Sequence, residues 1–296
     1  MESRFTTPIL FIIFNRPDTT QLVFNEIKKI KPTKLFVVAD GPRSHKEGEK
    51  DRCDQAKNII DQVDWDCEVV KNFSDTNLGC GKRVSSGITW FFENVESGII
   101  LEDDCVPDQS FFPFCQDLLE KYKYDERIMM ISGNNFQFGK KRGGGSYYFS
   151  KYNHIWGWAS WRRAWEYYDY DIKTFPSFLE NKEIENIWPS SKNMQAYWVR
   201  NFKKVFFHTL DTWDYQWTYV MWKEGGLCIL PNVNLVKNIG FDDRSTHTKI
   251  RVLQPEVKAM LSLVHPTFII QSFSADYYTY KRTRSFFSRI INYILL

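Results

Sequence analysis

The chain has 296 residues, and its 39 lysines and arginines nearly balance its 36 aspartates and glutamates, for a formal net charge of +3. This balance excludes the strongly basic composition of a nucleic-acid-binding protein, so we expect no nucleic-acid partner. The apolar fraction of 43% and the charged fraction of 25% are those of an ordinary globular protein.

The first part of the chain alternates short apolar runs with helical patterns. An apolar run bounded by polar residues predicts a buried strand, and apolar residues three or four apart predict a helix. The predicted strands are 9–14, 35–39, 68–73, 99–101 and 128–131. The predicted helices are 18–30, one that ends near residue 63, one within 79–95, and 111–124. This alternation predicts an α/β fold with a mostly parallel sheet and helices on both of its faces.

The second part of the chain has a different character. Residues 140–240 are rich in tryptophan and tyrosine and show no clean period. We therefore expect three regions: a core at 1–135, an aromatic-rich mixed extension of the same domain at 136–275, and a basic amphipathic tail at 276–296.

Polar side chains follow three of the predicted strands directly. In an open α/β sheet, ligands bind at the carboxyl ends of the strands, near the point where the strand order reverses. The residues at those positions are Asn15 and Arg16, then Asp40, and then Glu102, Asp103 and Asp104.

The acidic triplet Glu102-Asp103-Asp104 is the sharpest motif. Three adjacent carboxylates repel each other, and a hard divalent cation bridging a diphosphate suits oxygen ligands of this kind. The alternative is a solvated acidic turn that caps the next helix. The strand-end position favours a metal site with Mn²⁺ or Mg²⁺.

The other strand-end motifs each allow a structural explanation. Asp40-Gly41-Pro42 is also typical of a plain turn, and Arg16-Pro17 of a helix start. The segment 76–83 departs from the phosphate-binding loop motif at two positions. Thr76 stands where the motif has its first glycine, and Arg83 stands where it has Ser or Thr. Lys82 and Arg83 therefore either face a diphosphate or begin a solvated helix.

Aromatic residues and cysteines add weaker indications. Four tryptophans at 156, 158, 161 and 165 are expected mostly in the core, with one or two rings free to stack on a sugar. The six cysteines form no C-x-x-C pair, which indicates reduced thiols in a cytoplasmic protein. The apolar run at 8–14 is too short to span a membrane.

In its motifs the sequence resembles the GT-A-fold glycosyltransferases. The segment 100–112, Ile-Leu-Glu-Asp-Asp-Cys-Val-Pro-Asp-Gln-Ser-Phe-Phe, is similar to the Glu-Asp-Asp segment of N-acetylglucosaminyltransferase I and of bacterial family 2-like enzymes. The resemblance covers the first 135 residues well. Later it rests on the short matches at 157–158, 213–214 and 238–241.

The resemblance implies a GT-A (Rossmann-like) fold with a nucleotide-sugar-binding core and an acceptor-side catalytic extension. It assigns the metal to Asp104 and His247, and the catalytic base to Asp214, with Asp211 as the competing carboxylate. Donor binding falls to a larger set of residues. They are Asn15, Arg16, Asp40, Lys82, Arg83, Glu102 and Asp103.

The expected activity is a metal-dependent inverting transfer from a nucleoside diphosphate sugar, UDP-linked, to a saccharide or lipid-linked saccharide acceptor, in bacterial surface polysaccharide synthesis. Two alternatives stay open: a sugar nucleotidylyltransferase, and a non-catalytic sugar-binding module. The first needs a basic glycine-rich loop after the first strand, which 15–17 does not supply.

The C-terminal residues 285–296 place apolar side chains on one helical stripe beside basic ones. Such a stripe suits an anionic membrane surface, so we expect peripheral attachment to the inner face of the membrane. The alternative is a helix that packs on the protein's own core.

Overall fold

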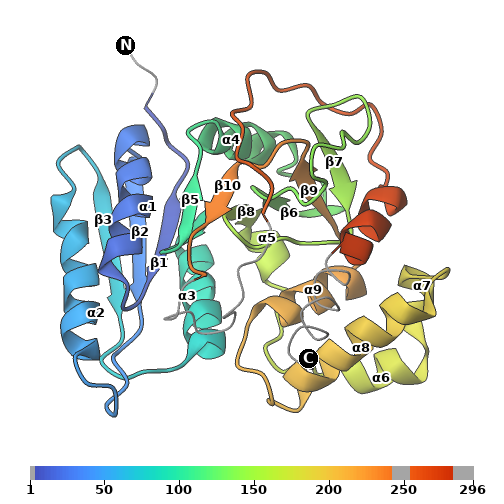
Figure 1. The fold of residues 1–296 in the computed structure, drawn as a ribbon, viewed down its shortest axis with the longest axis horizontal. Helices are drawn as coiled ribbons and strands as arrows, with labels where there is room; N and C mark the ends of the chain where they lie inside the picture. Colours follow the sequence, from blue (N-terminus) through green and yellow to red (C-terminus); the bar gives the residue numbers. More distant parts are fainter. Residues whose placement is uncertain (1–3, 242–253, 283–296) are drawn as a thin grey trace, which may run out of the picture.

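The computed structural model describes residues 4–241 and 254–282. An eight-stranded sheet of order β3-β2-β1-β4-β8-β6-β9-β7 forms its centre, beside a two-stranded sheet of β10 and β5. Figure 1 shows the helices arranged around these strands. The strands are β1 (Ile9–Ile13), β2 (Lys34–Ala39), β3 (Glu68–Phe73), β4 (Ser97–Glu102), β5 (Cys105–Pro107), β6 (Ile128–Ser132), β7 (Tyr147–Ser150), β8 (Trp158–Trp161), β9 (Leu227–Pro231) and β10 (Val236–Asn238).

The helices are interspersed with the strands along the chain. They include α1 (Pro17–Ile30), α2 (Glu49–Asn58), the 3-10 helix η1 (Ile59–Gln62), α3 (Cys80–Asn94), α4 (Phe111–Lys121), α5 (Arg162–Trp165), α6 (Phe175–Glu180), α7 (Glu183–Ile187), α8 (Lys192–Phe206) and α9 (Asp214–Lys223). The predicted helix that ends near residue 63 is thus α2 continued by η1.

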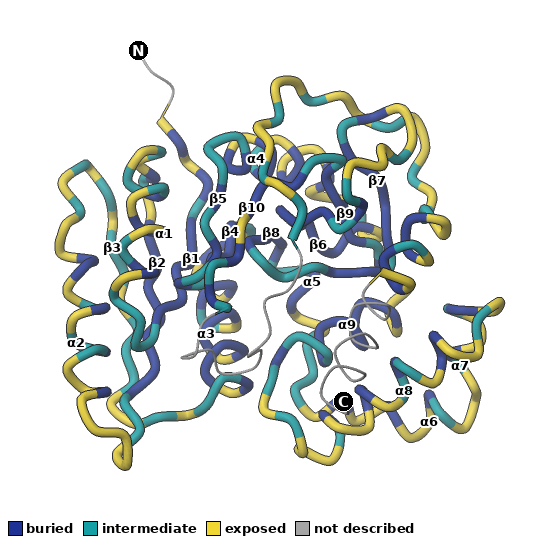
Figure 2. Tube along the Cα trace, viewed as in Figure 1, coloured by how far each residue is buried: buried dark blue, intermediate teal, exposed yellow. Residues whose placement is uncertain are grey.

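The parallel half of the sheet consists of β3, β2, β1 and β4, which all pair in parallel. Every residue of β1 is buried, as expected for a strand covered on both faces. Ile9, Phe11 and Ile13 pack in one core with α1, η1 and α4, whereas Leu10 and Ile12 pack in a second core with α3. Figure 2 shows these strands buried between helices whose outer sides are exposed.

The mixed half consists of β8, β6, β9 and β7. Strand β8 runs antiparallel to both β4 and β6, β9 runs parallel to β6, and β7 runs antiparallel to β9. The predicted α/β fold with a mostly parallel, Rossmann-like sheet is confirmed. The expected extension contributes three strands to this sheet, and the domain division at residue 135 stays a prediction.

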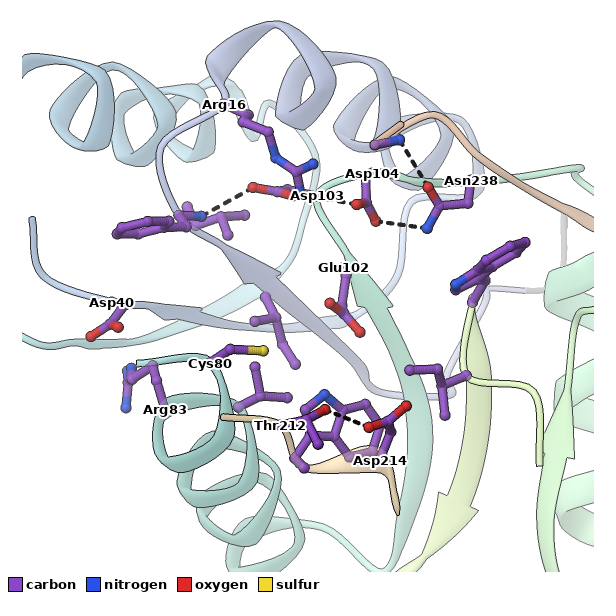
Figure 3. Close-up of a pocket in the computed structure, with 18 of the residues that line it drawn as sticks. Arg16, Asp40, Cys80, Arg83, Glu102, Asp103, Asp104, Thr212, Asp214 and Asn238 are labelled. Atoms are coloured by element: carbon purple, nitrogen blue, oxygen red, sulfur yellow. Dashed lines mark hydrogen bonds and ion pairs between the residues drawn. The ribbon is translucent and has the colours of Figure 1, made fainter. Parts of the chain in front are cut away.

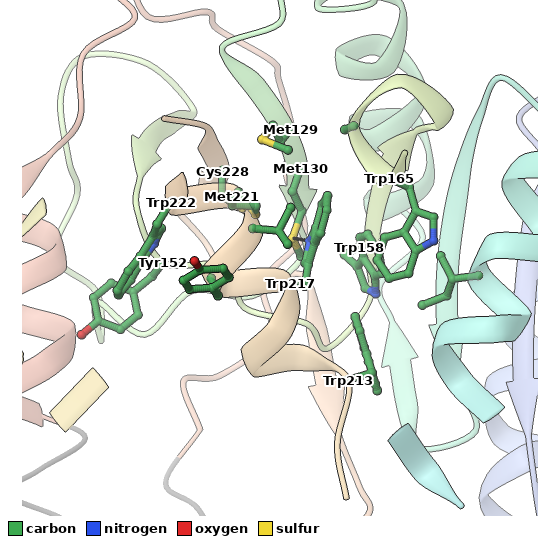
Figure 4. Close-up of a cluster of buried hydrophobic side chains, with 14 of the residues drawn as sticks. Met129, Met130, Tyr152, Trp158, Trp165, Trp213, Trp217, Met221, Trp222 and Cys228 are labelled. Carbon is green, nitrogen blue, oxygen red and sulfur yellow. Dashed lines mark hydrogen bonds between the residues drawn. The ribbon is translucent and has the colours of Figure 1, made fainter. Parts of the chain in front are cut away.

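A cluster of tryptophans fills the core beneath the mixed half (Figure 4). The rings of Trp158 and Trp213 stack with centroids 5.6 Å apart, and those of Trp165 and Trp217 lie 5.0 Å apart. All four are buried. The core interpretation therefore holds for Trp158, Trp161 and Trp165, which pack away from solvent.

Other sequence-based expectations have partial outcomes. All six cysteines are free. No helix among residues 4–241 and 254–282 has the length and apolar character needed to cross a bilayer. The amphipathic stripe at 285–296 lies outside the described residues, so membrane attachment stays a prediction.

Candidate active site

A cavity of about 640 Å³ lies at the carboxyl ends of β1, β2 and β4. This is the edge of the sheet at which the strand-end residues are predicted to gather. Two groups of residues that differ in charge are among those that line it. The charged wall comprises Arg16, Asp40, Arg43, Glu102, Asp103 and Asp104. The neutral wall comprises Asn134, Phe136, Asn153, His154, Ile155 and Trp156.

The acidic triplet occupies the middle of the charged wall (Figure 3). Asp103 is buried, accepts the backbone N–H of Phe14 at 3.1 Å and forms an ion pair with Arg16. Asp104 accepts a second hydrogen bond from the Arg16 guanidinium at 2.9 Å and one from the Asn238 amide at 3.3 Å. One arginine thus serves two of the three carboxylates.

The triplet carries more negative charge than its surroundings neutralise. Desolvation, with Asp104 and Asp103 next in importance, raises the pKa of Glu102 to about 8. Desolvation raises the pKa of Asp103 to about 6, although Arg16 opposes it. Burial alone would lower the pKa of Arg16, but the two aspartates raise it above its usual range. A second cation beside Glu102 and Asp104 would relieve this repulsion.

The donor set suits a divalent cation that is shared with a ligand. Mg²⁺ and similar ions are commonly held by one or two carboxylates together with substrate phosphates. In residues 4–241 and 254–282, no group of three or more His, Cys, Asp or Glu side chains could hold a metal ion alone. At Asp104 and Glu102, a metal ion would need phosphate oxygens of a ligand to complete its coordination. The second predicted ligand, His247, lies outside the described residues.

Asp40 shapes the edge of the charged wall. Its carboxylate accepts backbone N–H groups from Gly41 at 2.9 Å, Leu78 at 2.9 Å and Gly79 at 3.1 Å, and the Asn77 amide at 3.0 Å. A Cβ on Gly41 would lie 2.5 Å from the Thr76 backbone, so only glycine allows this loop approach. Asp40 fixes the loop at 77–79. Its role in donor binding stays a prediction.

A second buried carboxylate, missed by the sequence predictions, supports the same edge. Glu49 accepts hydrogen bonds from the Asn15 amide at 2.8 Å and from the Arg43 backbone N–H at 2.7 Å. Burial alone would raise the pKa of Glu49, but the hydrogen bonds from Arg43 and Asn15 lower it to about 2. Asn15 therefore lines the pocket as predicted and also holds the loop that carries Arg43.

The two basic residues at the start of α3 point to different places. Arg83 lines the pocket, is buried, and donates to the Ala39 carbonyl at 3.1 Å and to the Asn72 side chain at 3.0 Å. It ties the ends of β2 and β3 together. Lys82 is exposed and lines a separate groove with Trp90 and Tyr170, so the structure does not bring it to the cavity.

Asp211 and Asp214 reach the pocket from the loop before α9. Asp211 accepts the backbone N–H groups of Cys80 at 3.0 Å and Gly81 at 2.8 Å, so it caps α3 from a distant part of the chain. Asp214 begins α9, lines the cavity and accepts a hydrogen bond from the Thr212 hydroxyl. Asp211 therefore caps the N-terminus of α3. The general-base role of Asp214 stays a prediction.

The sequence predictions contain only one residue of the neutral wall, Trp156. Asn134 and Phe136 follow the predicted strand 128–131, and Asn153, His154 and Ile155 lie in the region that shows no clean period. There only the polar pair Asn153-His154 beside the tryptophans offered a signal. Trp156 lines the cavity and is partly exposed, in contrast to Trp158 and Trp161. Of the aromatic patch, this is the ring that can contact a ligand.

No family model and no curated protein matches the chain. Among solved structures, HddC from Yersinia pseudotuberculosis is 7% identical with a TM-score of 0.32, over 53% of this chain and 78% of that one. A 4-diphosphocytidyl-2C-methyl-D-erythritol synthase from Anaerococcus prevotii is 10% identical with a TM-score of 0.32, over 70% and 86%.

Two further structures have similar scores. The inositol-1-phosphate CTP transferase from T. maritima is 8% identical with a TM-score of 0.29, over 54% of this chain and 73% of that one. A UDP-glucose pyrophosphorylase in complex with UDP-glucose is 11% identical with a TM-score of 0.29, over 54% and 78%.

The prediction of a glycosyltransferase finds no support in the comparisons and is corrected. A synthase, a CTP transferase and a pyrophosphorylase are named among the four structures, and none of them is named as a glycosyltransferase. The specific resemblance to N-acetylglucosaminyltransferase I likewise finds no support. A strand-end acidic triplet such as the one in 100–112 does not by itself specify which bond is broken.

Proposed function

We propose that this chain is a transferase that handles a nucleotide-linked sugar and holds its phosphates through a divalent cation, Mn²⁺ or Mg²⁺. One observation carries the proposal. Three consecutive carboxylates at the end of β4 line a strand-end cavity in which a single arginine, Arg16, pairs with two of them. A divalent metal ion, bound together with a phosphate ligand, would supply the missing positive charge.

The residues of the charged wall have distinct tasks in this proposal. Asp104 and Glu102 hold the cation, which neutralises phosphate charge when bound. Asp103 holds Arg16 and the start of α1 in place through its ion pair and the Phe14 N–H. Asp40 and Glu49 keep the two loops that border the nucleotide side in position.

The reaction proposed is sugar nucleotidyl transfer, the remaining enzymatic alternative, with the phosphates held by the charged wall, since residues 15–17 do not supply a basic glycine-rich loop. An oxygen of a sugar 1-phosphate forms a bond to the α-phosphorus of a nucleoside triphosphate, and the bond from that phosphorus to the bridging oxygen breaks. The electron pair leaves with pyrophosphate. The attacking phosphate oxygen is already ionised, so catalysis depends on positioning and charge neutralisation.

The test combines binding with product analysis. Wild-type protein is titrated with nucleoside diphosphates by calorimetry, with and without Mn²⁺. We expect the Asp104→Asn variant to lose on the order of 100-fold in metal-dependent affinity while it stays folded. Asp117→Asn, an exposed aspartate on α4, is the matched control and should bind like wild type. Equal affinity in wild type and Asp104→Asn would refute the metal assignment.

Product analysis decides the reaction. Nucleoside triphosphates and sugar 1-phosphates are incubated with the protein, and ³¹P NMR detects pyrophosphate and the nucleotide sugar. Their metal-dependent formation is the expected result. Binding without any turnover would instead favour the sugar-binding module. Asp214→Asn is assayed in parallel. Because the attacking oxygen carries no proton, we expect only a small change in rate, and a loss of about 100- to 10,000-fold would contradict this reaction and favour a general-base role of Asp214.

A further inference from the structure

The two walls of the cavity differ in charge. The charged wall presents aspartates, a glutamate and arginines, whereas the neutral wall presents two asparagines, a histidine, two aromatic rings and an isoleucine. A nucleotide-linked sugar divides in the same way, because its phosphates are charged and its sugar ring is neutral. The division of the cavity therefore matches the division of such a ligand.

Two buried polar atoms of the neutral wall, Asn153 Nδ2 and His154 Nε2, have no hydrogen-bond partner among residues 4–241 and 254–282. Asn153 is only 9% exposed, and its Oδ1 accepts the Thr218 hydroxyl at 2.7 Å. This bond turns the amide so that its NH₂ group is the unsatisfied part. Buried polar groups are nearly always paired, so the two atoms need an explanation.

The imidazole of His154 is neutral and held in place. Burial lowers the pKa of His154 to about 3. Its ring stands edge-on to Phe136 at 4.6 Å and stacks near Tyr152 at 5.9 Å. A neutral imidazole offers one donor and one acceptor, and a sugar hydroxyl can supply the complement of either.

Trp156 supplies an aromatic surface beside these groups. Its backbone N–H donates to the Asn134 side-chain oxygen at 2.9 Å, and its ring contacts Phe136 at 5.3 Å and Phe241 at 5.4 Å. The ring is held on its edges and stays partly exposed to the cavity. An indole of this kind combines an apolar face with tolerance of nearby polar groups.

We propose that the neutral wall is the subsite for the sugar ring, in which the Asn153 and His154 side chains turn toward the cavity to hydrogen-bond to its hydroxyl groups and Trp156 packs against its apolar face. This inference rests on the proposed function, since it places the neutral part of the same ligand. It predicts that the wall contributes to the affinity of a nucleotide sugar and leaves that of the bare nucleotide unchanged.

The experiment compares two ligands on four proteins. Calorimetry with Mn²⁺ first identifies the tightest-binding nucleoside diphosphate among UDP, CDP, GDP, ADP and dTDP, and then measures its glucose, galactose and N-acetylglucosamine esters. The variants are His154→Phe, which keeps the ring packing without the nitrogens, and Trp156→Ala. His265→Phe, an exposed histidine outside the cavity, is the matched control beside wild type.

We expect at least one ester to bind wild type more tightly than the bare diphosphate. Both variants should bind that ester about 10-fold more weakly, and the diphosphate within about twofold of wild type. Equal losses for both ligands, or no loss, would overturn the subsite, as would wild type that gains nothing from any sugar. Failure of every diphosphate to bind would instead refute the proposed function, and this inference with it.

Discussion

The parallel and the mixed half of the sheet contribute to one cavity in different ways. The parallel half ends its strands in charged residues, and four parallel strands deliver those ends to one edge. The segments 134–136 and 153–156 of the mixed half contribute neutral side chains, and a core of tryptophans lies beneath this half. Strand geometry positions the charged wall, and aromatic packing positions the neutral wall. Mutations should therefore affect the charged wall through charge interactions and the neutral wall through packing.

The largest expected effect is on the packing of the mixed half. Trp217 is fully buried, contacts Trp165 at 5.0 Å, and its indole N–H donates to the Met130 sulfur at 3.3 Å. Trp217→Ala should lower the free energy of unfolding by about 3–5 kcal/mol, because it opens a large cavity. Urea unfolding followed by circular dichroism measures this loss.

The same unfolding curve tests whether the halves are coupled. Because both halves share one sheet, we expect Trp217→Ala to shift a single transition. Tyr124→Ala removes a side chain that is 86% exposed and should change stability by less than about 0.5 kcal/mol. Two separate transitions would contradict the coupling and leave the parallel half as an independent unit.

The next effect is a pH dependence within the mixed half. Asp276 is buried and accepts hydrogen bonds from Ser150, from Gln271 and from the Lys151 N–H. Burial raises its pKa to about 6. Between pH 4 and 6 the folded chain keeps a proton that the unfolded chain has released, so this group's contribution to stability falls as the pH rises, by about 3 kcal/mol in total.

Urea unfolding at pH 4, 5, 6 and 7 measures that slope. Asp276→Asn cannot ionise, so its stability should fall less than that of wild type over this range. The exposed Asp117→Asn variant should follow the wild-type curve. Parallel curves for wild type and Asp276→Asn would refute the raised pKa.

A smaller effect is expected where the two halves are joined. Asp211 belongs to the loop before α9 and caps α3, which covers the parallel half. Asp211→Ala should lower stability by about 1–2 kcal/mol, because two backbone N–H groups lose their acceptor. Thermal unfolding measures the change, with Asp117→Ala as control. An unchanged midpoint in Asp211→Ala would show that this junction contributes nothing to stability.

The smallest effect is expected at Lys82. Its side chain lies in the groove with Trp90 and Tyr170, outside the cavity. Lys82→Ala should therefore change the affinity for the nucleoside diphosphate by less than about twofold in the calorimetric assay, within the range expected for a screened surface charge. A loss of tenfold or more would restore the role predicted from the sequence.

The parallel half was predictable because local patterns determine it. The predicted strand 68–73 matches β3 (Glu68–Phe73), and the prediction that Glu102 and Asp40 meet at one sheet edge follows from parallel pairing. In the mixed half, β6 (Ile128–Ser132) was predicted as 128–131. Strands β7 and β8 were not predicted, because they are four residues long and fully buried. Such short runs carry no readable period.

The candidate site divides in the same way. Asp103 and Arg16 were found from their strand-end positions. Nothing in the sequence pointed to Asp211 as a cap of α3. The Gly81 N–H, which donates to Asp211, lies 130 residues away in the chain. Glu49 was missed for a similar reason: its partners are set by the folded loops. Contacts between distant segments are the part that sequence patterns leave out.

The position of β8 has a consequence for how the chain is made. All four strands of the parallel half have left the ribosome when residue 102 emerges. Strand β4 pairs on its other side with β8 (Trp158–Trp161), which is synthesised more than fifty residues later. At roughly 5–20 residues per second, the apolar edge Ile99–Leu101 stays unpaired for several seconds or longer. An unpaired apolar edge invites association with other chains. Chaperone demand during synthesis should therefore peak in this interval.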